Sequence, residues 1–102
     1  MATLEEITDR FRQAVGENSG LGRSIKFDLK GEGFVVIDGA EVVNEDRPAD
    51  LTLIISKADL EDLGQGRLDP MSAVVTGRLR LSDMAVAMQM QPKLQALFSR
   101  LR

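Results

Sequence analysis

The chain has 102 residues, of which 43% are hydrophobic and 28% are charged, and its formal net charge is −3 at pH 7. This length provides for one domain with one modest core, and the composition is ordinary for a globular protein. Acidic and basic residues are interspersed, so no electrostatic footprint for nucleic acid is visible. Cysteine and histidine are absent. Their absence excludes disulfides, thiolate chemistry, imidazole bases and most metal or haem ligation, and we predict no metal and no cofactor.

The N-terminal segment indicates a cytoplasmic protein. Glu5 and Glu6 stand where a secretory leader would be basic and then apolar, and no apolar run approaches the ~20 residues that span a bilayer. The terminal residues 99–102 differ from the Ser-Lys-Leu peroxisomal signal. We therefore expect no transmembrane segment and a bacterial cytosolic location.

The first predicted element is an amphipathic helix. Thr3 and Glu6 form a capping-box pattern at its start, and Gly16 is its expected end. The turn-forming residues 17–22 then predict a loop. The apolar stripe of the helix comprises Leu4, Ile7, Phe11, Ala14 and Val15.

Three strands in an antiparallel meander are predicted next. Apolar and charged residues alternate over 25–30, and Gly31-Glu32-Gly33 supplies a hairpin turn before the more apolar strand 34–37. Residues 41–44 form the third strand, which ends before Pro48 because proline cannot donate to a strand ladder.

The following segments alternate between strands and capped helices. Residues 49–55 form a strand, Ser56 caps a helix that ends at Gly64, and Asp69-Pro70 starts a short helix over 71–75. Residues 76–81 alternate as a half-buried strand, and Ser82-Asp83 then caps the last helix.

Pro92 interrupts that last helical pattern. Because proline lacks the amide donor, the pattern predicts two helical segments that meet at an angle. The second, from Lys93 to Leu101, is then expected to move as a lid hinged near Gln91.

Together these elements predict one α+β domain over residues 1–102. Its sheet has about five strands and is largely antiparallel or mixed, with the helices packed on one face.

No arrangement in the sequence predicts catalysis. The acidic residues fall in caps, turns and charged strand faces, where nothing separates the pKa values of a carboxylate pair. Gly31-Glu32-Gly33 and Gly64-Gln65-Gly66 lack the further residues of a phosphate-binding loop. We therefore predict that the protein is not an enzyme.

Two groups of residues allow a binding interpretation and a structural one. Arg78 and Arg80, with Arg67, could meet a lipid head group or anionic membrane, but charges that face solvent on an edge strand are the favoured interpretation. Met71, Met84, Met88 and Met90 suit a cavity for flexible apolar ligands, although spacing alone favours ordinary core packing.

The chain resembles the sterol carrier protein 2 (SCP2) lipid-binding domain family in the order and spacing of several motifs. The resemblance runs from about Phe27 to Leu97 and rests on Ala49-Asp50-Leu51-Thr52-Leu53, on Gly66-Arg67-Leu68-Asp69-Pro70 and on Thr76-Gly77-Arg78-Leu79-Arg80-Leu81-Ser82-Asp83-Met84. It departs from the family at Val74, where phenylalanine is usual, and at Ser82, where glycine is usual. Valine leaves space that phenylalanine would fill, so rigid sterol specificity is doubtful.

The resemblance implies an SCP2-like fold with an apolar tunnel between sheet and helices, closed partly by the C-terminal helix. We expect its volume to lie in the range of ~300–1,000 Å³ that is typical of small-molecule sites. The implied lipid-binding residues are Met71, Val74, Val75, Leu79, Leu81, Met84, Ala87, Met88, Leu94, Leu97 and Phe98.

The leading functional hypothesis is non-enzymatic binding or transfer of a fatty acid, fatty acyl-CoA, isoprenoid or sterol-like lipid. The alternative is an accessory module whose apolar groove receives a partner protein, such as an enzyme of isoprenoid-quinone biosynthesis. The expected partners are thus a lipid ligand or a partner enzyme and no nucleic acid, and the chain is expected to be a monomer or a weak homodimer.

Overall fold

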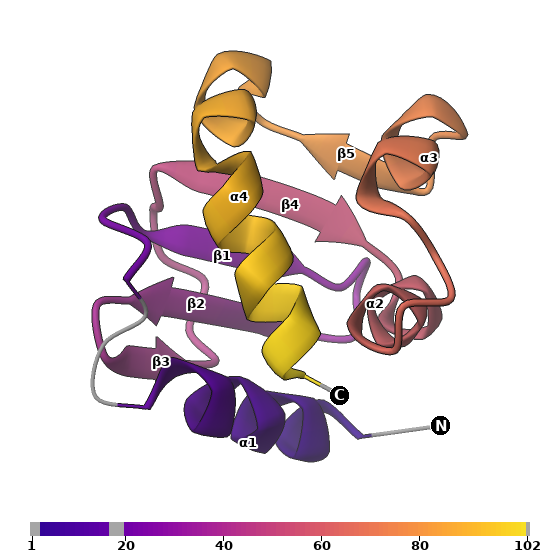
Figure 1. Cartoon of the computed structure of the whole chain (residues 1–102). Coiled ribbons are helices and arrows are strands. Elements are labelled where there is room, and N and C mark those ends of the chain that lie inside the picture. The colour runs from indigo at the N-terminus through magenta and orange to yellow at the C-terminus, as the bar shows by residue number, and fades with distance from the viewer. Residues whose placement is uncertain (1–2, 17–19, 102) are drawn as a thin grey trace.

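The computed structural model describes residues 3–16 and 20–101, so residues 17–19 of the predicted loop lie outside the described part of the chain. Figure 1 shows the arrangement of the elements. In chain order they are α1 (Leu4–Val15), β1 (Ile25–Asp28), β2 (Phe34–Asp38), β3 (Glu41–Val43), β4 (Leu51–Ile55), α2 (Lys57–Gly64), α3 (Pro70–Val75), β5 (Leu79–Leu81) and α4 (Met84–Arg100).

The five strands form one mixed sheet in the order β3-β2-β1-β4-β5. β1, β2 and β3 pair antiparallel, as the predicted meander requires, and β4 pairs antiparallel with β5. β1 and β4 pair parallel, because residues 44–50 carry the chain across the sheet before β4 begins. On that crossing Asp46 accepts a hydrogen bond from Lys26 Nζ at 2.8 Å. The predicted five-stranded α+β fold is confirmed.

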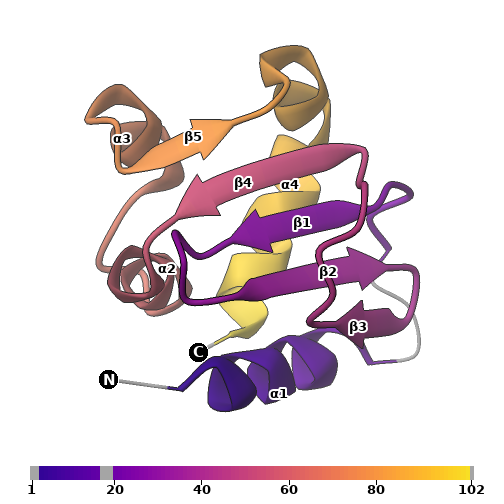
Figure 2. The ribbon, with the colours of Figure 1, turned by 180° about the vertical axis from the view of Figure 1, so that it is seen from behind.

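The helices lie on one face of this sheet. α4 crosses in front of the strands in Figure 1, and the strands lie in front of α4 in Figure 2. Three phenylalanine rings join the layers: the centroid of Phe27 on β1 lies 4.8 Å from that of Phe11 on α1 and 6.2 Å from that of Phe98 on α4. All three side chains are buried. The core therefore sits between the sheet and the helices, centred on strand β1.

Side-chain caps fix where the helices begin. The Thr3 hydroxyl accepts a hydrogen bond from the Glu6 amide at 3.1 Å, and the Asp69 carboxylate accepts one from the Ser72 amide at 3.1 Å. Asp83 in turn accepts from the Val86 amide at 3.1 Å. Each cap satisfies an amide that has no partner within its helix, which stabilises the start of the helix by about 1 kcal/mol.

The prediction of two helical segments around Pro92 was wrong, because α4 runs as one helix from Met84 to Arg100 with Pro92 inside it. The proline removes one amide donor, so the Met88 carbonyl loses its usual helical partner. Tertiary packing compensates for this loss: Leu97 is 1% exposed and Phe98 is 4% exposed. The segment after Pro92 thus contributes buried side chains to the core, and its movement as a lid stays a prediction.

Candidate functional site

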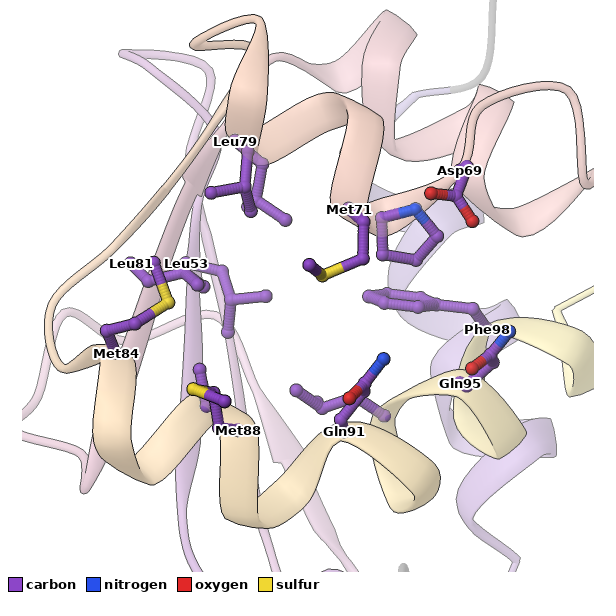
Figure 3. Close-up of a pocket in the computed structure, with 14 residues that line it drawn as sticks. Leu53, Asp69, Met71, Leu79, Leu81, Met84, Met88, Gln91, Gln95 and Phe98 are labelled. Atoms are coloured by element: carbon purple, nitrogen blue, oxygen red, sulfur yellow. The ribbon is translucent and has the colours of Figure 1, made fainter.

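A cavity of about 160 Å³ opens at the sheet edge formed by β5, between α3 and α4. Figure 3 shows the side chains that surround it. They are Leu53, Asp69, Pro70, Met71, Val74, Leu79, Leu81, Met84, Ala87, Met88, Gln91, Leu94, Gln95 and Phe98.

The floor of the cavity comes from the last two strands of the sheet. Leu53 on β4 pairs in register with Leu81 on β5, and Ile55 pairs with Leu79. Because alternate residues of a strand share a face, all four side chains point to the side of the sheet that carries the helices. Leu53 and Leu79 are buried, while Leu81 is partly exposed at the edge. The floor is entirely aliphatic.

The two walls come from helices on either side of β5. One face of α4 supplies Met84, Met88, Gln91, Gln95 and Phe98 at spacings of three or four residues, together with Ala87 and Leu94. The short helix α3 supplies the other wall, and the Asp69 cap with Pro70 at the first helical position fixes where α3 begins. Figure 3 shows the Met71 side chain reaching from this wall into the cavity.

Methionine side chains surround the mouth of the cavity and remain accessible to solvent. Met71 is 59% exposed, Met84 is 51% exposed and Met88 is 68% exposed. An unbranched thioether changes rotamer easily, so this mouth can adapt to apolar groups of different shape. The cavity therefore combines a fixed aliphatic floor with an adjustable rim.

Three polar side chains interrupt the apolar lining. Gln91 and Gln95 lie one turn apart on α4, and Asp69 lies at the start of α3. All three residues are exposed, and one carboxylate oxygen of Asp69 is occupied by the cap of α3. They can orient the polar end of a ligand by hydrogen bonding, but they include no nucleophile paired with a base.

The structure brings together nine of the eleven predicted site residues. The other two lie outside the cavity lining. Val75, at the last position of α3, is 83% exposed and does not line the cavity, while Leu97 is buried in the core and does not line it either. About 100° of helical rotation separates Leu97 from its neighbour Phe98, which does line the cavity.

The sequence prediction also missed five lining residues and overestimated the volume. Leu53, Asp69, Pro70, Gln91 and Gln95 line the cavity. Strand alternation could have identified Leu53, and the spacing of Gln91 and Gln95 from Met88 could have identified both glutamines.

The volume of about 160 Å³ falls below the predicted range, because Leu94 and Phe98 fill part of the space between α4 and the sheet.

Arg78 and Arg80 lie at the edge of the sheet, outside the cavity lining. β5 is an edge strand, and both side chains are exposed. Neither forms an ion pair or a hydrogen bond with another side chain in the described part of the chain. Arg67 instead pairs with Asp62 at 3.0 Å.

Within residues 3–16 and 20–101, no group of three or more acidic side chains is placed to hold a metal ion. In the same residues, no helix is long and apolar enough to cross a membrane.

Comparison with known families and structures gives a consistent result. The model of the SCP-2 sterol transfer family matches residues 3–95. No protein with curated annotation matches the chain in sequence.

Solved structures share the fold at low sequence identity. Sterol carrier protein 2 like 2 from Aedes aegypti has a TM-score of 0.73 and 19% identity, covering 90% of this chain and 93% of its own. A hypothetical protein and candidate sterol carrier from Thermus thermophilus has a TM-score of 0.61 and 24% identity, covering 93% and 76%. A UbiJ-SCP2 ubiquinone synthesis protein has a TM-score of 0.58 and 20% identity, covering 98% and 83%.

Proposed function

We propose that this chain, which belongs to the SCP-2 sterol transfer family, binds an apolar lipid in the cavity between α3, β5 and α4 and carries it without chemical conversion. The observation that carries the proposal is the cavity itself: an aliphatic floor open to solvent through a rim of exposed methionines. A ligand that is largely a hydrocarbon chain fits this chemistry.

The free energy of binding would come from burying the ligand and the rim together. Each methylene that leaves water contributes about 0.8 kcal/mol. Burial of the rim adds to this free energy, because a bound chain would cover apolar surface of Met71, Met84 and Met88 that now faces water. The length of the ligand's hydrocarbon chain should therefore be the main determinant of its binding affinity.

The polar groups of the site support a carrier in preference to an enzyme. Gln91 and Gln95 can hydrogen-bond a polar head, but a catalytic role would need a base or nucleophile held beside the ligand. The side chains that line the cavity provide no such pair.

The shape of the site favours flexible chains over rigid sterols. Only Phe98 offers an aromatic face among the lining residues, and the rim is made of flexible thioethers. A cavity of about 160 Å³ would have to widen to hold a whole lipid. A flexible chain can enter it in part, whereas a rigid sterol ring system would need the full widening. We infer a fatty acyl or isoprenoid chain as the ligand.

A displacement assay with matched variants tests this proposal. Unlabelled fatty acids of increasing chain length compete with a fluorescent fatty acid for wild-type protein and for two variants. Met88→Gln replaces an apolar rim side chain by a polar one of similar size and should weaken binding about fivefold, for a loss of about 1 kcal/mol. Val75→Gln makes a similar change at an exposed position outside the cavity and should leave affinity unchanged.

Two results would contradict the proposal. Equal affinities for short and long chains would show that hydrocarbon burial does not drive binding. Equal effects of Met88→Gln and Val75→Gln would show that the ligand does not occupy this cavity. Native mass spectrometry of protein purified from cells would identify the lipid that it carries.

A second candidate function is an accessory module that binds a partner protein through the same groove. Its specific support is that exposed apolar side chains extend beyond the cavity to Val75, which no small ligand would cover. The fold is shared with a UbiJ-SCP2 ubiquinone synthesis protein, which makes an isoprenoid-quinone enzyme a reasonable partner. This alternative predicts that a purified partner enzyme binds the wild-type chain and that Val75→Gln weakens that complex.

A further inference from the structure

We propose that the edge of the molecule formed by α3, β5 and the start of α4 docks on an anionic lipid bilayer, with the mouth of the cavity against the membrane. This inference rests on the proposed function, because a lipid carrier must load from and unload to a membrane. It concerns a surface that includes residues outside the cavity.

The first observation is where exposed apolar side chains gather. In the described part of the chain, the large hydrophobic side chains that are exposed are those of Met71, Val75, Met84 and Met88. All four belong to α3 or to the first two turns of α4, the two elements that flank β5 in Figure 1. Scattered surface hydrophobics need no explanation, but a group confined to one edge indicates an interaction surface.

The apolar surface at this edge extends beyond the cavity lining, because it includes Val75. It is 83% exposed and does not line the cavity, so a ligand inside the cavity would leave it in water. A bilayer that covered the rim would cover Val75 as well.

The second observation is an abrupt change of charge along the chain. Residues 70–102 contain five basic residues and one acidic residue, for a net charge of +4, whereas residues 1–69 contain eight basic and fifteen acidic residues, for a net charge of −7. The overall value of −3 conceals this division. Of these five basic residues, Arg78 and Arg80 lie at the β5 edge, whereas Arg100 lies at the other end of α4, where its guanidinium donates to the Ala14 carbonyl at 3.3 Å. Arg78 and Arg80 are therefore the charges that bear on an anionic surface at this edge, although the whole molecule is acidic.

Arg78, just before β5, and Arg80, within it, place positive charge at the edge of the sheet. Arg80 alternates with Leu79 and Leu81 and so points to the other face of the sheet, from which its long side chain can extend past the edge. Arg78 and Arg80 flank Leu79, and both side chains are exposed without an ion pair in the described residues. The acidic residues closest in sequence, Asp69 and Asp83, are helix caps whose carboxylates accept backbone hydrogen bonds. A long arginine side chain can lie along a membrane surface and reach lipid phosphates while neighbouring apolar groups enter the interface.

The acidic residues of α1 and β3 lie away from this edge, whereas the helix caps Asp69 and Asp83 belong to it. α1 and β3 are at the far side of the molecule from β5 in Figures 1 and 2. At about 0.1 M ionic strength charges are screened beyond about 10 Å, so the basic edge would feel an anionic membrane while the distant acidic residues would not repel it strongly. These charges favour a membrane over a second protein as the occupant of this edge.

Vesicle co-sedimentation tests the proposal with the intact chain. Wild-type protein should bind vesicles of phosphatidylcholine mixed with phosphatidylglycerol, should bind phosphatidylcholine alone much more weakly, and should be released by added salt. The Arg78→Gln/Arg80→Gln double variant should lose about 30-fold in affinity, since each basic side chain near an anionic surface contributes about fivefold. Val75→Gln should lose about fivefold through its apolar contribution.

Matched controls separate docking from lipid binding and from folding. Lys30→Gln removes an exposed basic side chain from the turn between β1 and β2 and should leave vesicle binding nearly unchanged. Val75→Gln and the double arginine variant should both bind a fluorescent fatty acid in solution as the wild type does, because none of these residues lines the cavity.

Distinct outcomes would overturn the inference. If the wild-type chain binds fatty acid in solution but does not prefer anionic vesicles, the docking surface is wrong and the proposed function stands. Loss of binding with Lys30→Gln equal to that with the arginine variants would assign the attraction to total charge. If analytical ultracentrifugation shows a homodimer that Val75→Gln dissociates, the edge is an interface between two copies and not a membrane surface.

Discussion

The C-terminal half of α4 offers a sharp test of whether that segment is core or lid. Leu97 is 1% exposed and does not line the cavity, so Leu97→Ala removes buried contacts without changing the binding surface. Truncations of this kind cost about 2–5 kcal/mol. For a domain whose whole unfolding free energy is about 5–15 kcal/mol, that is a large fraction of stability.

The expected result is a large loss of stability at unchanged lipid affinity. A cost of about 3 kcal/mol should lower Tm by roughly 12–24 °C, at about 4–8 °C for each kcal/mol. Urea unfolding followed by circular dichroism measures the free energy of unfolding, and fatty-acid displacement below the transition measures binding. Ser99→Ala is the matched control, because Ser99 is exposed on the same turn of the helix.

One result would refute this reasoning. If Leu97→Ala changed the free energy of unfolding by no more than Ser99→Ala does, the segment would not be packed as the structure shows. Truncation after Gln91 extends the test, because it removes the buried side chains of Leu94, Leu97 and Phe98. At about 1.5–3 kcal/mol for each, their loss is comparable with the total stability, so the truncated chain should fail to fold.

Three other perturbations test the cap of α3, the turn before β2 and the depth of the cavity. Asp69→Ala should lower the free energy of unfolding by about 1 kcal/mol in urea titrations, because the α3 cap is lost, whereas Asp69→Asn should retain most of it. Gly33→Ala should destabilise more than Gly39→Ala in thermal unfolding, since Gly33 has φ +124°, outside the left-handed helical region that Gly39 occupies at φ +62°, and a Cβ at Gly33 would also displace the Leu4 methyl 2.6 Å away. Phe98→Leu should shift the preferred fatty-acid length upward in displacement assays by enlarging the cavity, and an unchanged preference would place the ligand elsewhere.

Local signals in the sequence predicted the elements well because the same short-range physics forms them. Thr3, Asp69 and Asp83 cap helices as predicted, since a side-chain oxygen next to unpaired amides works wherever the chain later packs. Strand alternation placed Leu79 and Leu81 correctly on the buried side of β5 for the same reason.

The errors in prediction arose where tertiary packing decides between local options. Pro92 weakens a helix by itself, but the burial of Leu97 and Phe98 in the turns that follow it keeps α4 continuous. The mixed sheet agrees with the prediction, but the choice of β1 and β4 as the parallel pair depends on the path of residues 44–50 across the sheet, which no short sequence pattern specifies. Val75 shares the apolar character of its neighbours, and only the absence of a packing partner sets it apart.

The contact between Phe27 and Phe98 has a consequence for how the chain folds during synthesis. Phe27 belongs to the central strand β1, whereas Phe98 belongs to α4, which is translated after every strand of the sheet. The meander β1–β3 can pair early through local contacts and α1 can cover part of its apolar face, but the rest stays uncovered until α4 emerges from the ribosome. For that interval the nascent chain exposes a hydrophobic surface and an unpaired strand edge, that of β1 until β4 is made and that of β4 until β5 is made, the combination that favours aggregation and chaperone binding. Slow translation through the codons for residues 56–83 would prolong this exposure and should lower the yield of soluble protein.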